Sequence, residues 1–196
     1  MNSVKVLNKF KAPGNKPQGL SSEEIGLWMI LVEKGEKRLY GIPVLDALET
    51  GSAKSFIAVK LRDETGKELT SAEPVSVACL SKDSLPGWWT YNGTIYVGFS
   101  DKKIRTYNPD MTHKIAYGTN YYYTTSQVPD GMYFYFDGTL YYCSASADAI
   151  FSISVSTGVE TKVKINVGGS DFDVISRRLA LDGVITDNTG VNYTTR

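Results

Sequence analysis

A short pattern that occurs twice in the middle of the sequence constrains the fold more than any other feature. Residues 91–96 read Tyr-Asn-Gly-Thr-Ile-Tyr and residues 136–141 read Phe-Asp-Gly-Thr-Leu-Tyr, with the two glycines 45 positions apart. Asp182-Gly183 follows after another 45 positions. An Asn-Gly or Asp-Gly pair supplies the positive φ angles that a two-residue hairpin turn requires. A tight turn recurring every 40–50 residues or so is typical of a repeated four-stranded sheet.

Short strands are predicted over most of the remaining chain. Residues 27–32 are continuously apolar, as in a strand covered on both faces, and residues 55–61 alternate between two faces. Residues 75–80 and 161–167 are suited to further strands, whereas residues 45–50, followed by a glycine, are suited to one or two helical turns. We therefore predict an all-β protein of antiparallel sheets, arranged as a sandwich or as blade-like four-stranded units.

Turn-rich segments divide the chain into three predicted parts. Residues 1–24 are expected to form an extended arm, because the prolines and glycines between positions 13 and 19 exclude a helix. Residues 25–84 are expected to form a small antiparallel β unit that ends near Lys82-Asp83-Ser84-Leu85-Pro86-Gly87. Residues 85–196 are expected to form a tyrosine-rich β unit that carries the repeat.

The predicted arm is basic. It contains no acidic residue before Glu23 and carries four lysines, Lys5, Lys9, Lys11 and Lys16. Such an arm is suited to an acidic surface on a neighbouring subunit, and a frayed terminus is the alternative. No apolar stretch typical of a secretory signal follows Met1, so we expect synthesis in the cytoplasm without a signal peptide.

The repeated segments resemble the entry into the second strand of blades in kelch-type and quinoprotein-type β-propellers. In those families an Asp-Gly turn precedes an apolar and aromatic strand, as it does at Asn92-Gly93 and Asp137-Gly138. The double glycine of kelch repeats is missing from the expected position. A closed propeller needs about four or more blades, and the sequence accounts for at most two and a half. Either several subunits complete a ring, or the units are Greek-key sheets with a coincident spacing.

The order of a Pro/Gly-rich arm, a small β unit and a tyrosine-rich β unit resembles bacteriophage virion proteins such as head decorations, fibres, tail rings and adaptors. The resemblance is one of general organisation and assigns no site residue. It implies a non-enzymatic structural or assembly protein of a multi-subunit particle, located in the virion. Its partners would be copies of itself and other structural proteins of the same assembly.

Tyrosine is concentrated in one region, because 11 of the 13 tyrosines lie between residues 91 and 142. Consecutive strand residues point to opposite faces, so these rings cannot all share one core. We predict that the outward rings form a subunit interface, pack internally against each other, or bind carbohydrate. The candidate residues are Trp88, Trp89, Tyr121, Tyr122, Tyr123, Tyr133 and Tyr135.

The sequence offers little for catalysis, cofactors or metals. Positive and negative residues balance at 21 each, which disfavours nucleic-acid binding, and the apolar runs are too short to span a membrane. The one histidine, His113, is expected in an exposed polar turn. Asp171 and Asp173 are the candidate pair for a hydrolase or a calcium site, although turn formation is the simpler role. We expect no enzymatic activity, no cofactor and no metal, and two reduced thiols at Cys79 and Cys143.

Overall fold

The computed structural model describes residues 9–22, 28–52, 57–80, 93–134, 139–173, 184–186 and 192–194, and this part of the chain contains three four-stranded antiparallel sheets. The first sheet contains β1 (Pro17–Ser22), β2 (Trp28–Glu33), β3 (Arg38–Pro43) and β4 (Ile57–Lys60). The second contains β5 (Pro74–Leu80), β6 (Thr94–Phe99), β7 (Lys103–Tyr107) and β8 (Tyr122–Thr124). The third contains β9 (Gly131–Phe134), β10 (Thr139–Ser144), β11 (Ala149–Ser154) and β12 (Glu160–Lys162). The prediction of an all-β protein built from antiparallel sheets is confirmed.

Two further strand pairs follow the third sheet. They are β13 (Lys164–Val167) with β14 (Ser170–Asp173), and β15 (Val184–Thr186) with β16 (Asn192–Thr194). The helix among the described residues is α1 (Val44–Thr50), which ends at Gly51 in the left-handed conformation with φ 65°, as the sequence predicts. At seven residues α1 is too short to cross a bilayer. The described ranges contain no other helix that is long and apolar enough to cross one.

The three sheets repeat one local conformation. In each sheet the strands pair in the order of the chain, β1 to β4, β5 to β8 and β9 to β12. Immediately before the third strand of each sheet lies a non-glycine residue with positive φ: Lys37 (54°), Lys102 (60°) and Asp148 (49°). Positive φ is uncommon outside glycine, so its recurrence at one position marks the sheets as structural repeats.

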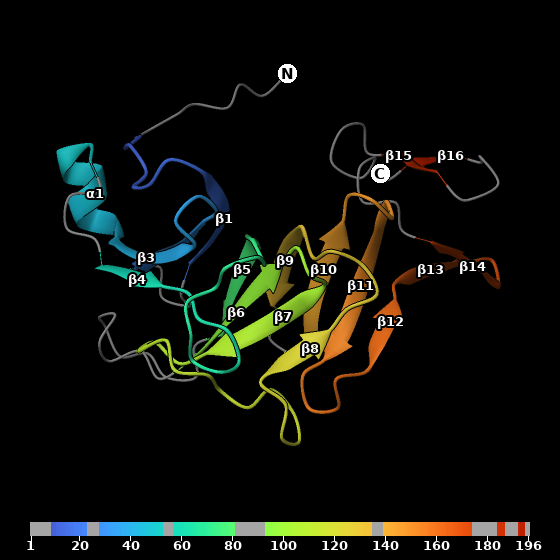
Figure 1. The fold of residues 1–196 in the computed structure, drawn as a ribbon. Coiled ribbons are helices and arrows are strands. Elements are labelled where there is room, and N and C mark those ends of the chain that lie inside the picture. The colour runs from blue at the N-terminus through green and yellow to red at the C-terminus, as the bar shows by residue number, and fades with distance from the viewer. Residues whose placement is uncertain are drawn as a thin grey trace.

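The sheets stack face to face in chain order, with the second sheet in the middle (Figure 1). Ile30, Val32 and Leu39 of the first sheet pack against Ile95 and neighbouring residues of the second. The second and third sheets share another buried cluster, which consists of Ala78, Tyr96, Ile104, Tyr123, Leu140, Tyr142, Ala149, Phe151 and Ile153. All six residues of β6 are buried as a result, whereas β10 alternates between buried and half-buried residues.

Contacts between sheets are concentrated at the first strand of each sheet, where β1 meets β5 and β5 meets β9. The backbones are close there: a Cβ added to Gly19 would lie 2.8 Å from Cα of Ser76. A Cβ on Gly98, in the neighbouring β6, would lie 2.9 Å from the carbonyl oxygen of Pro129, just before β9. The Ser76 hydroxyl donates a hydrogen bond to the Pro129 carbonyl, which joins β5 to the entry of β9.

The division of the chain into an arm and two β units does not describe these sheets. Residues 17–22 of the expected arm form β1, and its proline occupies the first position of an edge strand, where the missing N–H does not interrupt the pairing. The expected boundary at residues 82–87 lies outside the described residues, but the strands on either side of it, β5 and β6, pair within one sheet. A Pro/Gly-rich segment marks a connection between paired strands as readily as a boundary between domains.

Candidate functional site

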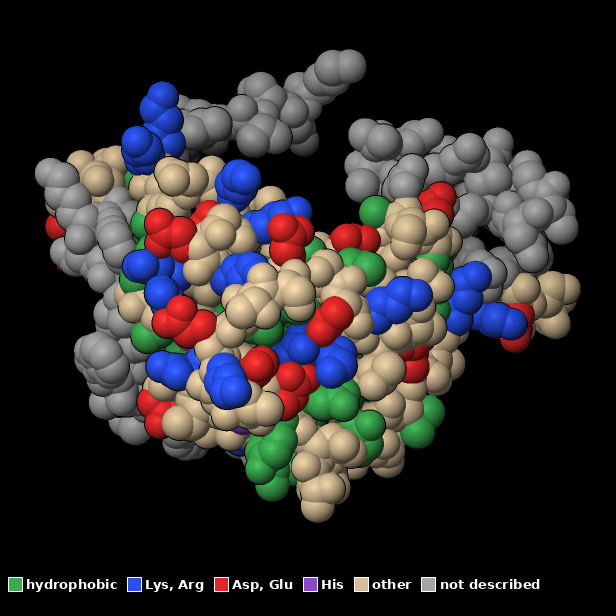
Figure 2. Space-filling model, in the orientation of Figure 1, with side chains coloured by type: hydrophobic (Ala, Val, Ile, Leu, Met, Phe, Trp, Pro, Cys, Tyr) green, Lys and Arg blue, Asp and Glu red, His purple; other side chains and the backbone are tan. Residues whose placement is uncertain are grey.

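Exposed apolar side chains lie on two adjoining connections, which precede β8 and follow β11. We call Ile115, Tyr121 and Val159 the loop patch; their exposed fractions are 52%, 38% and 60%. Figure 2 shows hydrophobic side chains gathered along the lower edge of the molecule, where Figure 1 places these connections. Tyrosine and aliphatic side chains in such a position are typical of a surface that binds another protein.

Local packing holds the two connections together. Gly158 has φ 71°, and a Cβ there would lie 2.6 Å from the ring of Tyr117. The hydroxyl of the buried Tyr123 donates to the Val155 carbonyl at 2.9 Å and lies 3.2 Å from the carbonyl oxygen of Ala116. The two loops are therefore fixed to each other through the core between the second and third sheets.

The three consecutive tyrosines have three different surroundings. Tyr121 is exposed, and its ring lies 5.9 Å from that of His113 in an edge-on arrangement. Tyr122 is half-buried, with the Lys103 ammonium 4.1 Å from its ring centroid. Tyr123 is 1% exposed, and burial raises its pKa. Tyr123 therefore belongs to the core rather than to an interface, and Tyr121 is the outward ring of the three.

His113 is not the exposed loop residue that the sequence predicts. Its ring lies 4.8 Å from that of Tyr107, and its Nε2 contacts the backbone carbonyl of Asp63. Tyr107 is fully buried and donates to the Arg62 carbonyl at 2.6 Å. The polar residues around His113 suggested exposure, but the neighbouring tyrosine rings cover it.

A buried arginine and its partners form the main charged cluster of the second sheet. Arg105 is 3% exposed, lies 2.7 Å from Asp101 and 3.1 Å from Glu64, and stacks over the ring of Phe99. Lys103 pairs with the same Glu64 carboxylate at 3.1 Å. These charges satisfy one another, which is the arrangement expected of a structural ion-pair cluster.

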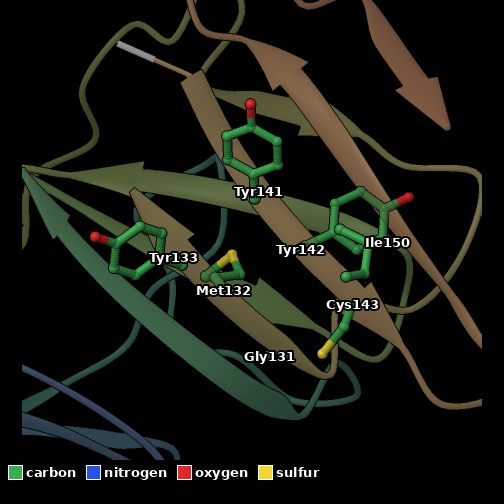
Figure 3. A pocket seen from close by; sticks show the side chains of 7 residues that line it. All are labelled: Gly131, Met132, Tyr133, Tyr141, Tyr142, Cys143 and Ile150. Carbon is green, nitrogen blue, oxygen red and sulfur yellow. The ribbon is translucent and has the colours of Figure 1, made fainter. Parts of the chain in front are cut away.

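A shallow apolar depression occupies the face of the third sheet that points away from the second (Figure 3). Its volume is about 340 Å³, and it is lined by Gly131, Met132, Tyr133, Tyr141, Tyr142, Cys143 and Ile150. Tyr133 is 63% exposed and pairs across the strands with Tyr141. Burial and the nearby Asp130 carboxylate raise the pKa of the Cys143 thiol, and Cys79 and Cys143 are not joined in a disulfide.

The remaining candidate residues are not brought together in one site. Lys9, Lys11 and Lys16 are exposed on the N-terminal segment, whose Phe10 and Ala12 pack beside the first sheet. Trp88, Trp89, Tyr135 and Lys5 lie outside the described residues. Asp171 is exposed in the β13–β14 hairpin and accepts a hydrogen bond from Asn166 at 2.8 Å, which is a turn-stabilising role. Across the described ranges no cluster of His, Cys, Asp and Glu is suited to a metal ion.

Sequence comparisons find neither a matching protein-family model nor a matching curated protein. Solved structures with a similar fold include a nidogen/laminin complex, with a TM-score of 0.50, 12% identity, and coverage of 94% of this chain and 65% of the other. The virginiamycin B lyase of Staphylococcus aureus gives a TM-score of 0.48, 14% identity, and coverage of 91% and 55%. A yeast Nup82–Nup159–Nup116 nucleoporin complex gives a TM-score of 0.46 and 9% identity, with coverage of 100% of this chain and 65% of the other.

These solved structures are β-propeller-like, and at such identities the similarity is one of fold alone. The chain spans between 55% and 65% of the length of the three chains it is compared with. The nidogen/laminin complex, at a TM-score of 0.50, supports the expected resemblance to propeller blades at the level of the four-stranded sheet.

Proposed function

We propose that the protein is a non-enzymatic assembly component that binds other proteins through the loop patch. The observation that carries the proposal is the exposure of Ile115, Tyr121 and Val159 on two connections that the core holds in place. Surface that is already ordered loses little conformational entropy on binding, and tyrosine contributes a large contact area with few rotatable bonds.

The proposal includes the kind of assembly. The protein would be made in the cytoplasm and incorporated into a multi-subunit particle, for which a bacteriophage virion is our candidate. Support comes from the general organisation of the sequence and from the exposed lysines Lys9, Lys11 and Lys16, which suit an acidic neighbour. The absence of enzymatic activity is part of the proposal. The buried carboxylate of Glu33 accepts hydrogen bonds from backbone N–H groups, and the partly exposed carboxylates of Asp101 and Glu64 pair with basic side chains, so all three have structural roles.

The test is self-association of the purified protein, measured by sedimentation over a range of concentrations. The wild type is expected to form oligomers, and the double substitution Ile115→Asp with Val159→Asp is expected to leave a folded monomer. Leu45→Asp is the matched control, because Leu45 is 63% exposed on α1, outside the loop patch. A wild type that remains monomeric at every concentration, or a control that dissociates as much as the double variant, would refute self-assembly through this surface.

Carbohydrate binding is the second candidate function, and the exposed ring of Tyr133 beside the apolar depression favours it. Sugars stack on flat aromatic faces of this kind. A glycan array probed with wild type, Tyr133→Ala and Tyr121→Ala is the test. Binding that is lost only in Tyr133→Ala would support this function, whereas an array without hits would remove it.

A further inference from the structure

The stack of sheets is covered at one end and open at the other. Beyond the first sheet, α1 contributes Ala47 to a buried cluster with Leu31, Tyr40 and Ile42, and Phe10 packs against the same cluster. A second copy that continued the stack from this end would first have to displace these elements.

The third sheet has no such cover among the described residues. Leu140, Tyr142 and Ser144 of β10 are buried toward the second sheet, while the residues between them are only half-buried. The open face carries Tyr133, Tyr141, Cys143 and Ile150, which surround the apolar depression. The corresponding face of the second sheet, which includes Tyr96, is fully covered by the third sheet.

The sequence repeat continues beyond the third sheet at the same spacing. The second strands of the second and third sheets begin at Thr94 and Thr139, and β15 begins at Val184. The interval is 45 residues in both cases (139 − 94 and 184 − 139), and a glycine precedes each strand. By position, β15 and β16 are therefore the second and third strands of a fourth sheet.

The pairing register agrees with this assignment. Ile95 pairs with Tyr107 in the second sheet, and both belong to the cluster shared with the first sheet. Leu140 pairs with Ile153 in the third sheet, and both belong to the cluster shared with the second. In each case the apolar pair one position into the second strand faces the preceding sheet. The equivalent pair in β15–β16 is Ile185 with Tyr193, again an isoleucine with a tyrosine.

We propose that β15–β16 docks onto the open face of the third sheet, with Ile185 and Tyr193 against Tyr141 and Cys143, as the beginning of a fourth sheet. The occupant is this segment of the chain itself, because its register position supplies the apolar pair that the open face lacks. Figure 1 draws β15–β16 apart from β9–β12, so docking is a closure of this hairpin onto the sheet. The inference is independent of the proposed assembly role, which concerns the loop patch.

The first experiment is crosslinking of the full chain. In Ile185→Cys, a short bismaleimide is expected to join position 185 to Cys143 within one chain, because stacked sheets lie about 10 Å apart. Thr186→Cys is the matched control, since the next strand residue faces away from the third sheet and should link much less. Peptide mass spectrometry identifies the joined positions, and the mass of the product shows whether one chain or two are involved.

Two outcomes overturn the proposal. Equal linkage from positions 185 and 186, or linkage from neither, shows that the hairpin does not dock in this register. A link to Cys143 that occurs only between two chains shows that a second copy, rather than the same chain, covers the face. Both outcomes are separate from the sedimentation test, because neither variant changes the loop patch.

The second experiment leaves the open face unaltered and measures its protection. Tyr193→Asp should expose Cys143 and increase its rate of thiol labelling about tenfold, if docking stabilises the closed form by about 1.4 kcal/mol. Cys79, which packs in the core between the first and second sheets, is the internal control and should label at an unchanged rate. Equal Cys143 labelling in wild type and Tyr193→Asp overturns the proposal, and so does a parallel increase at both cysteines.

Discussion

Replacing Glu33 with glutamine tests whether a buried carboxylate fixes the N-terminal segment to the first sheet. Glu33 is 1% exposed at the end of β2. Its Oε1 accepts hydrogen bonds from the N–H groups of Lys16 at 3.0 Å and Gly35 at 2.8 Å, and its Oε2 accepts one from Glu36 at 2.7 Å. One side chain therefore satisfies donors in the β2–β3 turn and in the segment that enters β1.

The structure allows the cost to be estimated. Glutamine retains one oxygen acceptor but places an amide NH₂ group opposite the N–H of Glu36, leaving this partly buried donor without its acceptor at a cost of about 1–3 kcal/mol. The two remaining bonds change from charge-assisted to neutral, which loses about 1 kcal/mol each. Removing a buried charge returns part of this loss. We expect the free energy of unfolding to fall by about 2–4 kcal/mol.

Urea unfolding followed by tryptophan fluorescence gives the free energy, and amide exchange at Lys16, Gly35 and Glu36 localises the effect. Glu36→Gln is the matched control, since Glu36 forms an exposed ion pair with Arg38 at 2.8 Å and should cost less than about 1 kcal/mol. If the two variants agree to within about 0.5 kcal/mol, or if exchange at these three amides is unchanged in Glu33→Gln, the assigned role of Glu33 is wrong.

Three further predictions concern a glycine, an ion pair and a buried phenol. Gly158→Ala should lower the free energy of unfolding in urea by about 1–3 kcal/mol more than Gly168→Ala does. Both glycines have positive φ, but only at Gly158 would the new Cβ meet a ring, that of Tyr117. Equal losses in the two variants would contradict this contact. Burial alone would raise the pKa of Glu64, but its hydrogen bonds and two basic partners outweigh burial and hold that pKa below its ordinary value of 4.5. A depressed pKa contributes stability that is lost as the pH falls below about 4.5. Glu64→Gln should therefore be less stable than wild type at neutral pH, and in urea titrations between about pH 6 and pH 3 it should lose less stability than wild type does. Equal losses in the two proteins would count against the ion pair. Burial raises the pKa of Tyr96 to about 12, so the folded state favours the neutral phenol and loses stability as the pH rises above 10.0. The absorbance of tyrosine phenolates should therefore reach its full value only when the protein unfolds. Complete ionisation of the tyrosines in a folded chain would contradict the burial of Tyr96.

The sequence predicts the second and third sheets more readily than the first. Asn92-Gly93 and Asp137-Gly138 mark the entry into β6 and β10, so the repeat is visible without a structure. The first sheet lacks such a pair before β2, and its outer partner β1 lies in a Pro/Gly-rich segment that reads as an arm. Local composition describes a turn or a strand, but it does not reveal which strand will pair with a distant edge.

The side chains that organise the surface are harder to predict for the same reason. Asp101 and Arg105 are four residues apart, and their pairing could be proposed from the sequence, whereas Glu64 reaches Arg105 from 41 residues away. The loop patch depends on the contact between Tyr117 and Gly158, which lie on connections of two different sheets. Such sites become visible only when the stacking of the sheets is known.

The close approach of backbones at Gly19 and Gly98 has a geometric consequence. Neighbouring sheets touch main chain to main chain along one margin, whereas full-sized side chains separate them elsewhere. Each sheet therefore forms a wedge-shaped layer that is thinner at this margin. Successive layers are inclined to one another and rotate about an axis instead of extending in a line. The angle that each wedge subtends depends on how small the residues at its thin margin are. A bulkier residue at position 19 would push the first two sheets apart at this margin and so reduce the angle between them.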